Sequence, residues 1–119
     1  MITVENVFSN NVNFEHFNEM SKEQKFDLYV KIGADATNSD MDHVSDFFSK
    51  LEMNDKIGFV HFVCSTAMRH NDYKHDMYEC IFLSKTFEDL KSFAYSNKDT
   101  FEMMMSECLQ YHKKLLTGK

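Results

Sequence analysis

The fold of this chain is decided by the stretch Ile57-Gly58-Phe59-Val60-His61-Phe62-Val63-Cys64. Its β-branched and aromatic residues are enriched in strands, so the run is typical of a strand buried in a sheet. Wound as a helix, however, the same run places Val60, Val63 and Cys64 on one face together with Ala67 and Met68. The stretch alone leaves both interpretations open, and other parts of the chain have to decide between them.

A second apolar run favours the strand. Residues 78–83, Tyr-Glu-Cys-Ile-Phe-Leu, distribute their apolar side chains all round a helical wheel, which is typical of a strand buried on both faces. The polar residues 69–76 lie between the two runs, so we predict a hairpin with a long loop, although no tight-turn dipeptide joins the strands. Residues 2–8, Ile-Thr-Val-Glu-Asn-Val-Phe, are also rich in strand formers.

The predicted fold is therefore α+β: a small antiparallel sheet, with strands near residues 2–8, 57–65 and 77–83, packed with about four helices. A hairpin alone is marginally stable, so the N-terminal strand or a helix has to cover it. The alternative is an all-α bundle of five or six helices. The absence of Pro and the presence of only three Gly would suit that bundle too.

Helices are predicted between the first and second of these runs. Ser21 can cap a helix and Gln24 can reach back to it, as in a capping box, with Gly33 as the expected end. Another helix is expected to begin near Asp40 and to end at residues 54–55. Its apolar positions recur at helical spacing and form one stripe that faces a core: Val44, Phe47, Phe48 and Leu51.

The C-terminal third is also predicted to be helical. Thr86 can cap one helix, and a break near Ser96-Asn97 separates this helix from the next. The last helix carries apolar and histidine side chains at consistent spacing: Phe101, Met104, Met105, Cys108, His112 and Leu115. One face of this helix is therefore expected to pack on the core.

Length and composition indicate a single domain over residues 1–119. A chain of this length can bury a core without disulfide or metal staples. Hydrophobic residues make up 43% of the chain, which argues against disorder, and no Pro-, Gly- or Ser-rich linker divides it. The three cysteines include no CxxC pair and are expected to be reduced thiols. Because neither a signal peptide nor a membrane-spanning run is present, we expect a cytoplasmic protein.

The net charge of −6 disfavours direct binding of nucleic acid or of an anionic membrane surface, since both reward Lys and Arg. A protein partner with a basic surface is compatible with it. The chain has one Arg against twelve Lys, no Pro and no Trp. That bias resembles the output of an AT-rich genome, such as those of many phages and viruses.

Two sets of residues are candidates for a protein-binding surface. Asp42 and Asp46 lie four apart on the predicted helix that begins near Asp40, on the side away from its apolar stripe. These three carboxylates could dock on a basic groove. Arg69 and Tyr73 lie in the predicted polar loop, and both residue types are common anchors of protein interfaces.

The same loop holds the only cluster with metal-ligand chemistry, formed by His70, Asp72, His75 and Asp76. Imidazoles and carboxylates are metal ligands, but the spacing matches no established metal motif. We therefore expect no metal or cofactor, and keep a metal-binding enzyme or sensor that uses this loop as an alternative.

No catalytic motif of useful specificity occurs, and no glycine-rich phosphate loop is present. The sequence favours a small acidic binding protein, of phage or viral type, that docks on a host protein and blocks it. That host protein could be one that handles nucleic acid. A homo-oligomeric structural protein is a further alternative.

Overall fold

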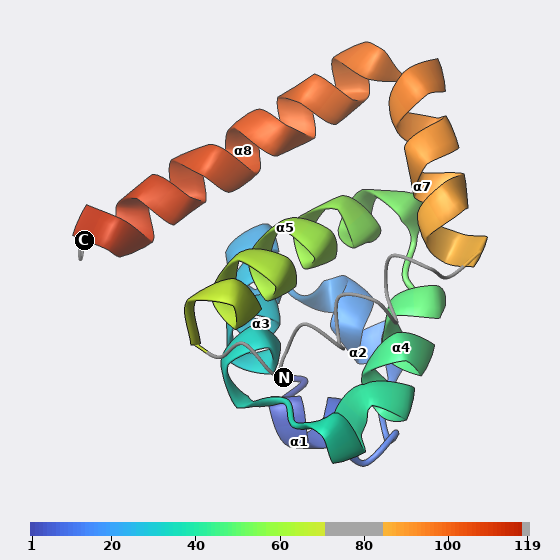
Figure 1. Cartoon of the computed structure of the whole chain (residues 1–119), viewed down its shortest axis with the longest axis vertical. Coiled ribbons are helices and arrows are strands. Elements are labelled where there is room, and N and C mark those ends of the chain that lie inside the picture. Colours follow the sequence, from blue (N-terminus) through green and yellow to red (C-terminus); the bar gives the residue numbers. More distant parts are fainter. Residues whose placement is uncertain (71–84, 118–119) are drawn as a thin grey trace.

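The described part of the chain is all-α. The computed structural model describes residues 1–70 and 85–117, and these contain no strand (Figure 1). They form α1 (Val4–Phe8), α2 (Phe14–Glu19), α3 (Lys22–Asp35), the 3-10 helix η1 (Asn38–Asp40), α4 (Met41–Ser49), α5 (Met53–His70), α7 (Lys85–Ser96) and α8 (Lys98–Thr117). The α+β prediction is wrong, and the all-α alternative matches the structure, although the described ranges alone hold more helices than that alternative expected.

The predicted strand near residues 57–65 lies inside α5. Ile57, Phe59, Phe62 and Val63 are all buried, with at most 2% of each residue exposed. Helix α5 packs against α3, α7 and α8, and Phe59 also meets the rings of α4. A helix covered on several sides is apolar nearly all round, so its sequence loses the single stripe that marks a surface helix. That loss made the run resemble a buried strand.

The predicted strand near residues 2–8 is also wrong, because these residues form α1 and its cap. The Thr3 hydroxyl accepts from the Asn6 backbone N–H at 3.3 Å, and the Asn6 side-chain oxygen accepts from the Thr3 N–H at 2.9 Å. This capping box satisfies two helix N-terminal donors and outweighs the strand preference of Val4 and Val7. The third predicted strand, 77–83, lies outside the described residues.

Local capping chemistry was predicted better than the helix ends. The capping box of Ser21 and Gln24 is confirmed, with distances of 3.1 and 2.9 Å. Gly33 does not end α3, which continues to Asp35. Residues 54–55 lie in the first turn of α5 rather than at the end of α4, and Thr86 lies within α7 instead of capping it.

The two glycines of the described chain both lie where α3 and α5 meet. A Cβ atom on Gly33 would lie 2.7 Å from the backbone oxygen of Val63 and 2.8 Å from the Cβ of Thr66. A Cβ atom on Gly58 would lie 2.9 Å from the ring of Phe26. Because real Cβ atoms essentially never approach backbone atoms this closely, position 33 requires Gly, which allows the two helix backbones to touch.

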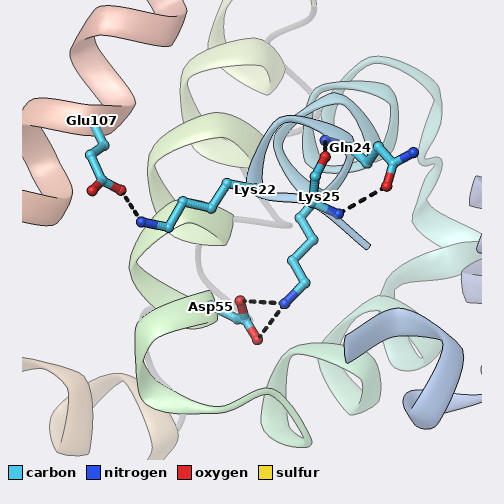
Figure 2. Close-up of polar contacts among 6 residues, drawn as sticks. Lys22, Gln24, Lys25, Asp55 and Glu107 are labelled. Atoms are coloured by element: carbon cyan, nitrogen blue, oxygen red, sulfur yellow. Dashed lines mark hydrogen bonds and ion pairs between the residues drawn. The ribbon is translucent and has the colours of Figure 1, made fainter. Parts of the chain in front are cut away.

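Polar contacts hold the start of α3 against two other helices (Figure 2). The Lys25 ammonium pairs with the Asp55 carboxylate of α5 at 3.1 Å, and their side chains are only 14% and 17% exposed. The same ammonium lies 4.7 Å from the centre of the Phe17 ring, a favourable cation–π position. Lys22 points the other way and pairs with Glu107 of α8.

Helix α8 folds back from the end of α7 and packs against α5 (Figure 1). Its Tyr111 ring lies 5.4 Å from the Phe26 ring and 5.9 Å from the Phe62 ring, centre to centre, and its hydroxyl donates to Asp27 of α3. Cys108, one turn before Tyr111 on the same helix, is buried in the core. The inner face of α8 thus closes the core over α3 and α5.

We predict that Gly33→Ala destabilises the protein by about 2 kcal/mol, in spite of the better helix propensity of Ala. The added methyl group meets backbone atoms of α5 that cannot move alone, so α3 and α5 have to separate. Gly58→Ala is the matched control, because its methyl group meets only ring atoms of Phe26 and Tyr29, and a shift of these side chains does not separate the two backbones. Urea unfolding of both variants measures the difference in their free energies of unfolding. Equal losses of stability would contradict the direct backbone contact at Gly33.

Candidate binding surfaces

The acidic residues predicted to bind a partner divide into two kinds. The Asp40 carboxylate accepts from the Thr37 N–H at 2.8 Å and from the Thr37 hydroxyl at 3.0 Å, so it caps η1. Asp46 pairs with Lys50 one helical turn away, at 3.0 Å, with both side chains still at least 40% exposed. Asp42 is exposed. The outer face of α4 therefore offers Asp42 and Asp46, while Asp40 is committed to local structure.

The other sequence candidates lie at the border of the described residues or beyond it. Arg69 and His70 occupy the last positions of α5, and their side chains are not described. Tyr73, Asp72, His75 and Asp76 lie outside the described residues. In the part of the chain that the structure describes, His, Cys, Asp and Glu side chains nowhere gather in groups of three that could hold a metal ion.

The negative charge is concentrated in one half of the chain. Residues 1–56 contain eleven Asp and Glu against five Lys, which accounts for the whole net charge of −6. Residues 57–119 carry eight acidic and eight basic side chains and are neutral overall. Helices α1 to α4 thus carry the excess acid, whereas α7 and α8 belong to the neutral half.

An apolar cleft of about 320 Å³ lies between α5, α7 and α8. Most of its lining comes from aliphatic, aromatic and methionine side chains, and its polar members are a histidine and a lysine: Ile57, Val60, His61, Leu90, Lys91, Ala94, Phe101 and Met105. This volume is near the lower end of the range typical of ligand pockets, and it suits one or two apolar side chains of a partner.

Helical spacing brings these side chains together. Ile57, Val60 and His61 follow one another at i, i+3 and i+4 on α5, and Phe101 and Met105 are one turn apart on α8. The same spacing extends the cleft outwards. Tyr95, 86% exposed, lies one turn beyond Lys91, and Leu109, 57% exposed, lies one turn beyond Met105.

Most of the exposed large apolar side chains lie on these two helices. Tyr95, Met103, Leu109 and Leu115 belong to α7 and α8, and Met1 completes the set among the described residues. Tyrosine and methionine are enriched in protein interfaces, where they supply large contact areas. Apart from Met1, the exposed large apolar side chains of the described residues therefore belong to the neutral half of the chain.

His61, which lines the cleft from α5, contacts a histidine of α8. The Nδ1 atom of His112 on α8 lies 3.4 Å from the Nε2 atom of His61 on α5, and the two rings meet edge to face with centres 5.5 Å apart. Both rings are half-buried. Burial lowers the pKa of His61, and the neighbouring His112 lowers it further, because both disfavour the imidazolium form.

Cys108, on α8, carries a buried thiol. Burial, with a smaller contribution from Glu107, raises the pKa of Cys108 to about 11. The thiol is therefore protonated at neutral pH and a poor nucleophile. Cys108 acts as a small apolar residue beneath α8.

A second, polar crevice of about 360 Å³ lies between α3 and α8. Its charged and polar groups already serve the joint between these helices: Lys22 pairs with Glu107, and the Tyr111 hydroxyl donates to Asp27. Burial and this hydrogen bond raise the pKa of Tyr111. The crevice is a seam that holds α8, and the apolar cleft is the better candidate for a binding site.

Sequence reasoning missed the cleft and the histidine pair. The row on the last helix that includes Phe101, Met105 and His112 was predicted from its spacing. Its counterpart on α5 was assigned to a strand, so His61 could not be placed opposite His112. A helical interpretation of residues 57–64 would have put Ile57, Val60 and His61 on one face.

Comparisons of the chain with protein-family models, with curated proteins and with solved structures find no match. Among the helices that the structure describes, none combines the length and the apolar character that a bilayer crossing needs. The function has to be inferred from the surfaces themselves.

We predict that the folded protein binds the apolar dye 1-anilinonaphthalene-8-sulfonate in the cleft and enhances its fluorescence. Ala94→Phe fills the cleft and should remove most of the enhancement. Ser92→Phe is the matched control: it adds the same ring to the same helix at an exposed position, two residues away and on the other side. Titration of dye into native protein tests this, and equal fluorescence in both variants would contradict a dye site in the cleft.

Proposed function

We propose that this chain is a small protein-binding domain that docks on a partner with a basic surface and blocks it. The observation that carries the proposal is the apolar cleft between α5, α7 and α8. Tyr95 and Leu109 are exposed one helical turn beyond its lining residues Lys91 and Met105. Exposed apolar surface around a concave centre is typical of sites where a partner inserts an anchor residue.

The size and shape of the cleft favour one kind of partner segment. A volume of about 320 Å³ between three helices suits a leucine, methionine or phenylalanine from an amphipathic helix, which is a common mode of recognition. The surrounding Met105 and Leu109 side chains are adaptable or flexible enough to pack against such a segment. The cleft thus supplies the apolar part of the interface.

The charge of this chain indicates a second property of the partner, a basic surface. The net charge of −6, all of it carried by residues 1–56, attracts a basic protein over distances longer than a contact. Asp42 and Asp46 on the exposed face of α4 are the carboxylates we expect to contribute most to this attraction. Arg69 and Tyr73 remain candidate anchors for the partner.

Origin and location belong to the same proposal. The bias towards Lys, Asn and Phe resembles the output of an AT-rich genome and supports a phage or viral source. The partner is then a host protein, and a protein that handles nucleic acid is one candidate. The absence of a disulfide framework among the three cysteines supports a cytoplasmic location.

The test is a pull-down with the whole tagged chain, followed by affinity measurements on any captured protein. We expect Ala94→Phe to weaken binding about tenfold or more, since an anchor residue can no longer enter, whereas Ser92→Phe leaves it unchanged. Binding that is equal in both variants would refute the cleft as the docking site.

Charge is tested separately with the double variant Asp42→Lys, Asp46→Lys, which spares Asp40 and its cap on η1. We expect slower association and a weaker dependence on salt, with little change in dissociation. Asp99→Lys with Glu102→Lys, in the neutral half, is the matched control for net charge. An equal effect of both double variants would show that only the total charge counts, which would overturn the role of α4.

A further inference from the structure

Helix α8 lies at the edge of the molecule, where it packs against α5 and α7 and leaves part of its surface exposed (Figure 1). Four exposed residues follow one another at i, i+4, i+7 and i+11, which places them on one side of the helix: Glu102, Ser106, Leu109 and Lys113. This α8 stripe has a charged residue at each end. Its apolar member, Leu109, is 57% exposed.

The two charged ends of the α8 stripe have opposite signs. Neither Glu102 nor Lys113 takes part in an ion pair among the described residues. Their backbones lie about 16 Å apart along the helix axis, too far for the two side chains to pair with each other. A partner helix that satisfies both charges therefore carries a cation opposite Glu102 and an anion opposite Lys113, at the same separation.

A second copy of α8, laid antiparallel on the first, meets this requirement. Glu102 and Lys113 share their midpoint along the helix with Ser106 and Leu109. A two-fold axis through that midpoint brings each Glu102 opposite Lys113 of the other copy. The same register places each Leu109 opposite the small Ser106, which leaves room for the larger side chain. The stripe is thus complementary to itself in both charge and size.

Electrostatics disfavours two other arrangements of the copies. In a parallel pair of α8 helices, Glu102 would face Glu102 and Lys113 would face Lys113, and like charges placed opposite each other repel. Contact through the helices of residues 1–56 would bring together the part of the chain that carries the whole net charge of −6. An interface through α8 joins helices of the neutral half instead.

We propose that this chain forms a weak antiparallel dimer through the α8 stripe. Leu109 of each copy forms its centre, and a Glu102–Lys113 ion pair closes each end. One helix from each copy makes a small interface, so we expect a Kd on the order of 100 µM. Because Leu109 also lies one turn beyond the lining of the apolar cleft, the dimer competes with partner binding, and this consequence alone rests on the proposed function.

Sedimentation equilibrium of the whole chain over a range of concentrations tests the dimer. We expect Leu109→Ala to weaken dimerisation about tenfold, since each dimer loses both leucines. Met103→Ala is the matched control, because Met103 is 56% exposed, almost the same as Leu109, but lies on a different side of α8. A chain that is still monomeric at about 1 mM would leave the stripe to a different partner and overturn the proposal. Equal effects of the two variants would also overturn it.

The antiparallel register has a test of its own. Glu102→Lys and Lys113→Glu each place like charges opposite each other, so each should weaken dimerisation about tenfold. The double variant exchanges the two charges and should dimerise as the wild type does, and an equimolar mixture of the two single variants should form mixed dimers. Lys31→Glu, exposed on α3, is the control for the net charge of Lys113→Glu. A double variant and a mixture that both stay monomeric would overturn the register.

The dimer and the proposed function can fail separately. Sedimentation involves this chain alone, whereas affinities for a partner are measured on protein far more dilute than the dimer needs. A failure to dimerise therefore leaves the proposed function standing, and a failure to find a partner leaves the dimer standing.

Discussion

The contact between the α3 and α5 backbones at Gly33 is the constraint on which the rest of the structure depends. It brings α5 close enough for Tyr29 and Phe26 of α3 to pack on its rings, with Tyr29 5.4 Å from Phe59 and Phe26 4.7 Å from Phe62, centre to centre. Once α5 is fixed in this position, α4 closes over Phe59 and α8 closes over Phe62. Helices α1 and α7 also pack on this pair, α1 on α3 and α7 on α5.

Some interactions between neighbours in sequence could be predicted, and interactions set by the tertiary structure could not. The capping box at Ser21 was found because it needs only residues three apart. The stretch 57–64 was assigned wrongly because burial on several sides removes the periodicity that distinguishes a helix from a strand. At α1, the strand preference of Val4 and Val7 concealed the Thr3 and Asn6 cap, which is encoded just as locally.

The candidate surfaces show the same division. The spacing of Asp42 and Asp46 predicted an exposed acidic face, but it could not reveal that Asp40 is occupied by Thr37. The buried face of the last helix was predicted from the spacing of its apolar residues, but this spacing does not show which helix that face packs against. The cleft arises only where α7 and α8 meet α5, which is distant from them in sequence, so its recognition required the positions of all three helices.

The way α8 is attached sets the order in which the molecule opens. Helices α3 and α5 are joined by direct backbone contact, whereas α8 is held by side chains: Cys108, Tyr111, His112 and the ion pair of Glu107. A unit held in this way can detach as a separate cooperative segment while the centre stays folded. Each such opening uncovers the Phe26 and Phe62 rings. The central aromatic cluster is thus the surface that a protease or a chaperone would meet first.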